Sequence, residues 1–127
     1  MSGEIREARA AIAQALQGLT MNDQPVNVYA DYPRQWALPA LAVGPASGDY
    51  VVQERLGAAR VNFTVIAATT PANNAADLAA LEDMAVLVLN RLTVTEPIAS
   101  PTYTDLGSIE AATIYIPVQA HITLDRE

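Results

Sequence analysis

The chain of 127 residues contains no cysteine and no lysine, and it has one histidine and one tryptophan. Without cysteine it can form no disulfide, thiolate nucleophile or zinc–thiolate site, and the composition is compatible with a cytosolic protein. Without lysine it can use no Schiff-base lysine, phosphate-loop lysine or lysine general base. These two absences exclude several large classes of enzyme.

Positive charge is also scarce. Seven basic residues, all of them arginines, stand against 14 acidic residues, and the formal net charge at pH 7 is -7. A chain with this balance repels a phosphate backbone at long range. We therefore do not expect general nucleic-acid binding.

Long hydrophobic runs are missing as well. No apolar stretch approaches the roughly 20 residues that a membrane-spanning helix needs, and the N-terminal sequence MSGEIREARAAIAQAL resembles neither a signal peptide nor an anchor. We expect no membrane association. The hydrophobic content of 51% and charged content of 17% favour a packed core. The length predicts one domain over residues 1–127.

Two segments have the 3.6-residue periodicity of amphipathic helices. One covers residues 4–19. The other starts at an N-cap supplied by Asn73 or Asn74 and runs to Leu92. Its second half, residues 84–89, is apolar on nearly every face, which indicates burial on both sides, either within its own domain or against a neighbouring subunit.

The other regular segments have β patterns, and turn signals at GPASGD and Gly57 join the middle ones into an antiparallel meander. Strands are predicted at residues 26–30, 38–44, 50–56, 59–67 and 112–124. In the last strand Pro117 favours an edge position or a bulge, because it cannot donate to a ladder. We expect its apolar face to pack on the second helix. Together the elements predict an α+β fold, a mainly antiparallel β-sheet with two helices packed against it.

No catalytic, cofactor-binding or metal site assembles from these patterns. His121 and Asp125 could be drawn as a base and its orienting group, but residues four apart in a strand lie about 13 Å apart, too far for a hydrogen bond. Glu82 and Asp83 are adjacent on a helix, point in different directions and cannot chelate one metal ion. We therefore expect a protein that is not an enzyme and holds no cofactor.

One loop is a candidate protein interface. Residues 31–38, DYPRQWAL, have no helix or strand period. They include Tyr32, Arg34 and Trp36, the three side-chain types that most often anchor protein interfaces. Two interpretations stay open: the loop joins another protein, or Trp36 folds back to cover the edge of the sheet.

The order of elements resembles that of the tail terminator proteins of long-tailed bacteriophages, also called tail completion or minor tail proteins. The resemblance covers nearly the whole chain. It runs through the N-terminal helix, VNVYA, LPALAVG, VNFTVIAAT, the ALEDMAVLVLNRL helix and TIYIPVQAHITL. The lysine-free, alanine-rich composition is similar to that of phages of high-GC hosts. The resemblance implies a non-enzymatic structural protein that is made in the host cytoplasm and located in the virion tail.

The same resemblance implies a set of partners. It implies a homo-hexameric ring on the last ring of the tail tube, in contact with the tail tube protein and with the head-side connector protein. DNA passes through the lumen of such a ring without specific binding. Another connector protein of the same virion would share these features. An alternative of a different class is a small-ligand-binding or regulatory α+β domain, with its pocket between the helices and the sheet.

Overall fold

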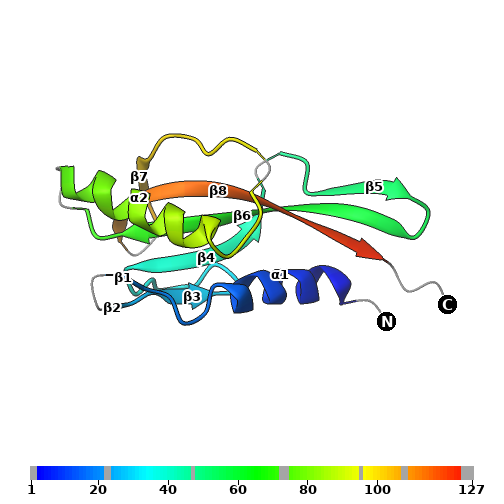
Figure 1. Cartoon of the computed structure of the whole chain (residues 1–127), viewed down its shortest axis with the longest axis horizontal. Coiled ribbons are helices and arrows are strands. Elements are labelled where there is room, and N and C mark those ends of the chain that lie inside the picture. Colours follow the sequence, from blue (N-terminus) through cyan, green and yellow to red (C-terminus); the bar gives the residue numbers. More distant parts are fainter. Residues whose placement is uncertain are drawn as a thin grey trace.

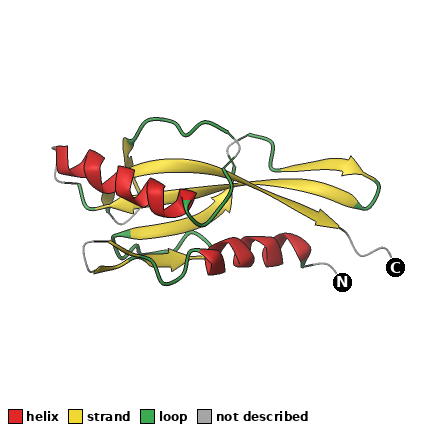
Figure 2. Ribbon diagram, in the orientation of Figure 1, coloured by secondary structure: helices red, strands yellow, loops and turns green. Residues whose placement is uncertain are grey.

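The computed structural model describes residues 3–21, 24–46, 48–71, 75–94, 96–106 and 109–123. Two helices and a mainly antiparallel sheet confirm the predicted α+β class (Figures 1 and 2). The helices are α1 (Glu4–Ala15) and α2 (Ala75–Leu89). The strands are β1 (Thr20–Met21), β2 (Gln24–Pro25), β3 (Asn27–Tyr29), β4 (Ala40–Pro45), β5 (Val51–Arg55), β6 (Ala58–Thr69), β7 (Thr102–Asp105) and β8 (Glu110–Thr123).

The main sheet has the strand order β3-β4-β6-β8-β7, and β5 also pairs with β6. Strand β8 runs antiparallel along the whole of β6, while β4 and β5 share the other side of β6, at residues 63–68 and 58–61. Only the pairing of β3 with β4 is parallel within the described sheet. Strands β1 and β2 form a separate antiparallel ladder.

Asn62 fixes the place where β4 gives way to β5. Its carbonyl accepts a hydrogen bond from the Ala46 amide at 3.0 Å, and its own amide donates to the Tyr50 carbonyl at 2.7 Å. Its side-chain Nδ2 donates to the Asp49 carbonyl at 2.8 Å. Beyond this point β5, residues 58–62 of β6 and residues 119–123 of β8 continue at one end of the molecule, and their tip lies beyond both helices (Figure 1). We call this extension the arm.

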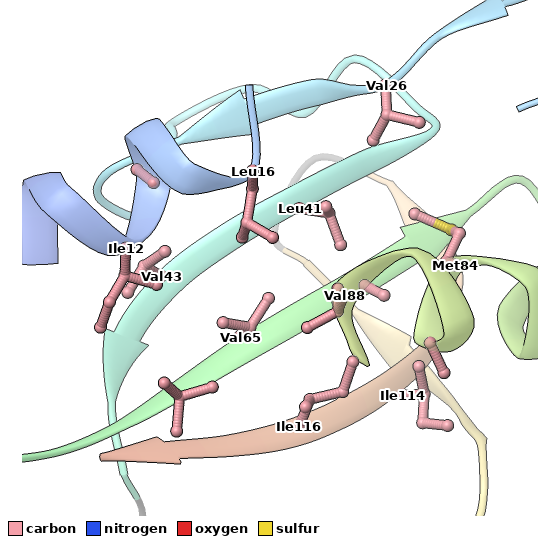
Figure 3. Packing of buried hydrophobic residues seen from close by; sticks show 14 of the residues in the cluster. Ile12, Leu16, Val26, Leu41, Val43, Val65, Met84, Val88, Ile114 and Ile116 are labelled. Carbon is pink, nitrogen blue, oxygen red and sulfur yellow. The ribbon is translucent and has the colours of Figure 1, made fainter. Parts of the chain in front are cut away.

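Both helices cover the same face of the sheet, where the side chains of three central strands alternate into one core (Figure 3). The predicted packing of the last strand on the second helix is confirmed for Ile116, which is fully buried in one core with Val88. The C-terminal end of β8, with Ile122, lies away from α2 (Figure 1). Burial of each large apolar side chain stabilises the fold by about 1.5–3 kcal/mol. The labelled core residues are Ile12 of α1, Leu16 just after α1, Val26, Met84 and Val88 of α2, and Leu41, Val43, Val65, Ile114 and Ile116 of the sheet.

Several element boundaries differ from the prediction. Helix α1 ends at Ala15 rather than at residue 19, and Gly18 follows it with a φ of 82°, the left-handed conformation that commonly ends helices. Helix α2 ends at Leu89, three residues before the predicted end. None of the predicted strands covers β7. The candidate caps Asn73 and Asn74 lie outside the described residues.

Pro117 lies where its missing amide is tolerated. Strand β8 is inside the strand order, but β7 pairs only with its residues 110–113. From Ile114 onward, no strand of the described chain pairs with β8 on the side away from β6. The predicted preference of Pro117 for an edge is therefore met at this position.

Candidate functional site

The candidate interface loop, residues 31–38, joins β3 to β4 and contains no helix or strand, as predicted. An ion pair holds its start to α1, with Arg9 Nη2 3.2 Å from Asp31 Oδ1. Two hydrogen bonds hold its end to β3. Asn27 Nδ2 donates to the Ala37 carbonyl at 2.8 Å, and the Ala37 amide donates to Tyr29 Oη at 3.3 Å. The loop is thus fixed at both ends.

The loop and β3 build a small aromatic cluster. Trp36 packs edge-on against Tyr29, with ring centroids 6.1 Å apart and planes at 69°, and lies 6.3 Å from Tyr32. Aromatic pairs of this kind contribute about 0.5–1.5 kcal/mol beyond their buried area. Trp36 is half-buried, while Tyr32 remains 46% exposed. Both side chains therefore keep surface that another protein could contact.

Gly44 of β4 provides the place where Tyr32 lies. A Cβ at Gly44 would clash with the Cε1, Cζ and Oη atoms of the Tyr32 ring, so only glycine leaves room for it. Gly44 neighbours Val43, which belongs to the helix-covered core, so Gly44 and Tyr32 lie on the opposite face of the sheet. Burial raises the pKa of the Tyr32 phenol, and nearby Tyr115 adds to this effect.

Arg34 is the third predicted contact residue. It is exposed and makes no hydrogen bond, ion pair or ring contact within the part of the chain that the structure describes. The structure thus brings Tyr32 and Trp36 together and leaves Arg34 separate on the same loop. Its guanidinium is available for a forked bond to a carboxylate.

Sequence reasoning missed Tyr29 as a member of this cluster. The pattern of VNVYA indicated only a short strand, and β3 does contain this tyrosine. The signal available was the closeness of a third aromatic side chain, Tyr29, to the loop in sequence. We call Tyr29, Tyr32, Arg34 and Trp36 the aromatic site.

A polar recess lies on the same face of the sheet, away from the helices. It has a volume of about 430 Å³, and Arg60, Glu96 and Tyr115 are among its lining residues. It adjoins a recess of about 420 Å³ beside Tyr32, because Thr64 and Tyr115 line both. The ligand-binding alternative placed a pocket between the helices and the sheet. Buried side chains fill most of that space, and a recess of about 210 Å³ remains beside α2, with Leu81 of α2 and Ala112 of β8 among its lining residues.

His121 has a partner that the sequence did not reveal. Its Nδ1 lies 3.0 Å from Glu54 Oε1 across the arm, and its side chain is 64% exposed. The hydrogen bond from His121 lowers the pKa of Glu54. Asp125, the partner considered from the sequence, lies outside the described residues. Among those residues, no group of three or more histidine, aspartate or glutamate side chains is arranged to hold a metal ion.

The sequence matches no protein-family model and no curated protein. In the described chain, no helix has the length and apolar character needed to cross a membrane.

Proposed function

We propose that this chain is a tail terminator of a long-tailed bacteriophage, a non-enzymatic protein of the virion tail. In this proposal six copies form a ring that ends the tail tube and joins it to the head-side connector. The observation that carries the proposal is the aromatic site, a loop fixed at both ends that presents two aromatic side chains and an unpaired arginine at the surface. Such residues dominate the energetics of protein interfaces.

The fixed conformation of the loop favours binding. A loop that is already ordered loses less conformational freedom when a partner docks, so more of the contact energy appears as affinity. The bonds to α1 and β3 supply this order, and Gly44 leaves room for the Tyr32 ring to approach the backbone of β4 closely. Carboxylate partners for Arg34 are abundant on a second copy, because the chain has 14 acidic and seven basic residues. The loop thus suits a contact with another subunit or with the tail tube.

The negative charge of the chain also agrees with a terminator ring. A net charge of -7 on each copy gives the assembled ring a negative field. DNA that moves through such a lumen is repelled by the wall rather than retained.

The test is assembly of purified variants, followed by sedimentation velocity and electron microscopy. We expect wild-type protein to form rings. Arg34→Ala and Trp36→Ala should remain folded but fail to assemble or to cap tail tubes, since truncating such anchors costs about 2 kcal/mol or more of binding. Arg6→Ala is the matched control, because Arg6 is an exposed arginine on α1. Unchanged stoichiometry, affinity and capping in both loop variants would show that the loop is not an interface.

Tail termination itself is tested in virions. Phage particles that lack this protein should have overlong tails without heads, because nothing stops the growth of the tube. Tails of normal length joined to heads would contradict the terminator role, whatever the behaviour of the purified chain.

A second candidate function is the binding of a small ligand. The polar recess favours it, because the Arg60 Nε atom on its lining is buried and has no hydrogen-bond partner in the described structure. An anionic metabolite would supply that partner. Light scattering separates the two functions: a stable monomer that binds a metabolite supports the second, and a concentration-dependent hexamer supports the ring.

A further inference from the structure

The arm ends in an exposed leucine. Leu56 lies in the two-residue turn between β5 and β6 and is 72% exposed. Gly57 follows it with a φ of 82°, a conformation that glycine adopts without strain. Arg55, just before the turn, is also exposed and makes no ion pair within the described residues. The tip of the arm therefore presents one large apolar side chain beside one positive charge.

Helix α2 presents a complementary surface. Leu78, Val86 and Leu89 are 48%, 54% and 48% exposed, and their spacing places them on one flank of the helix. Exposed Glu82 lies among them, one helical turn from Leu78 and one from Val86. The second half of α2 is therefore buried within its own domain on one side only. Met84 and Val88 on that side are buried, while Val86 and Leu89 are exposed. We call Leu78, Glu82, Val86 and Leu89 the α2 flank.

The charges of these two surfaces are opposite. Helix α2 contains three acidic residues and no basic residue. Of the acids, Asp77 is buried and accepts a hydrogen bond from Tyr103 Oη at 2.7 Å, which leaves Glu82 and Asp83 exposed. The tip of the arm contributes the guanidinium of Arg55, while the neighbouring Glu54 is paired with His121.

The two surfaces cannot meet within one molecule. In Figure 1 the arm extends to the right, and α2 occupies the left half of the long axis. A contact between them must therefore join different copies, with the arm of one copy on the helix of the next. A contact between two different surfaces of the same chain is heterologous, and it produces a ring when the rotation between copies closes.

We propose that the tip of the arm docks on the α2 flank of a second copy of this chain. Leu56 packs among Leu78, Val86 and Leu89 of that copy, and Arg55 pairs with its Glu82. The apolar contact removes four exposed side chains from water, and the ion pair fixes the direction of docking. This inference rests on the proposed function in that it identifies the contact through which the ring would close.

The experiment is charge reversal followed by sedimentation equilibrium over a range of concentrations. Arg55→Glu and Glu82→Arg should each weaken association, by roughly tenfold or more. The variant with both changes should recover association, because at every interface a glutamate at position 55 of one copy then pairs with an arginine at position 82 of the next. Arg6→Glu and Glu7→Arg are the matched controls, two exposed residues of α1 with the same changes in charge.

A second pair of variants tests the apolar half of the contact. Leu56→Asp and Leu89→Asp should each abolish association while the circular dichroism spectrum stays that of the wild type. Both side chains are exposed, and aspartate is well tolerated in the turn that contains Leu56.

The outcomes separate this contact from the proposed function. If wild-type chains associate but no arm or α2 variant changes the association, the docking is wrong while the ring remains. A wild-type chain that stays monomeric overturns both the docking and the ring. If the charge-reversal pair behaves as expected but virions lacking the protein have normal tails, the docking holds and the terminator role fails.

Discussion

At the scale of single residues, Glu54 and His121 form an ionisable pair on the arm. This pair lowers the pKa of Glu54. The imidazole lies 3.0 Å from the carboxylate and lowers the pKa of Glu54, while partial burial opposes the shift. The two residues are 67 positions apart in sequence. Glu54 lies in β5 and His121 lies in β8. The pair forms because both strands are hydrogen-bonded to β6, one on each side of it.

We predict that His121→Ala raises the pKa of Glu54 toward its ordinary value, because the hydrogen bond is the main cause of the lowering. A carboxyl group with a lowered pKa in the folded state stabilises the fold fully above its unfolded-state pKa. It loses that contribution as the pH falls through the folded-state pKa. The melting temperatures of wild type and His121→Ala should therefore converge in acid and differ at higher pH.

The measurement is an NMR titration of side-chain carboxyl carbons, with melting curves recorded over the same pH range. Thr123→Ala is the control, since Thr123 lies two residues further along β8 and is exposed. An identical Glu54 titration in wild type and His121→Ala would show that the pair does not form in solution.

At the scale of elements, periodicity located both helices and the long strands β6 and β8, while short β-rich or apolar runs bounded by turn signals located β3, β4 and β5. Apolar residues recur every 3.6 positions in α1 and alternate in β6 and β8, because one face of each element enters the same core. Strand β7 has no such pattern, since it is almost wholly exposed. It is held by contacts distant in sequence, the bond from Tyr103 to Asp77 and the Thr104–Thr113 hydroxyl bond at 2.8 Å. Residue spacing within β7 does not encode them.

The sequence predicted which loop and which residues form the candidate site, but not how their side chains pack. Composition singled out the loop with Tyr32, Arg34 and Trp36 because aromatic residues are unusual in a stretch without regular structure. Its packing depends on the parallel pairing of β3 with β4 and on Gly44 beneath Tyr32. Strand direction and register are set by the whole sheet, so local sequence could not supply them.

Ile116 tests the packing between β8 and the helices. The side chain is fully buried, and it faces the core that α1 and α2 cover. Ile116→Asp should abolish soluble folding, because an unpaired buried charge costs several kcal/mol against a total stability of about 5–15 kcal/mol. Ile116→Val should cost only about 0.5–1.5 kcal/mol.

Soluble yield, circular dichroism and urea unfolding measure these effects. Thr123→Asp is the matched control, because it places the same charge at an exposed position of the same strand. If Ile116→Asp melts like the wild type, the assignment of this face of β8 to the core is wrong.

At the scale of the whole molecule, the surfaces available for contact are distributed around the domain. The helices cover one face of the sheet, Tyr32 lies on the other face, and the tip of the arm lies beyond both helices (Figure 1). A subunit with contact surfaces on different sides can touch two neighbours and a third partner at once. This arrangement suits a ring that is stacked on a tube.

The distribution of arginines leads to a last prediction, that the protein does not retain duplex DNA. Of the described arginines, Arg9 pairs with Asp31, and Arg91 donates to the Ala15 carbonyl at 3.1 Å. The exposed Arg6, Arg34 and Arg55 lie on α1, the loop and the arm. Arg60 also lies on the arm, where both it and Arg55 are close enough to Glu54 to lower the pKa of that carboxyl group, so the described arginines bring at most two cations together. Several clustered cations are needed to neutralise adjacent phosphates and gain free energy from counterion release.

Fluorescence anisotropy of a labelled duplex measures this directly. At about 0.1 M salt, where the Debye length is about 10 Å, we expect no binding at protein concentrations up to about 10⁻⁴ M, the weak end of ordinary non-specific affinity. A variant carrying both Glu82→Arg and Asp83→Arg is the control, because it creates a cluster of positive charge on α2. Wild-type binding that weakens steeply with added salt would show that the chain presents a basic surface to DNA, and a lumen built from it would hold the DNA rather than let it pass.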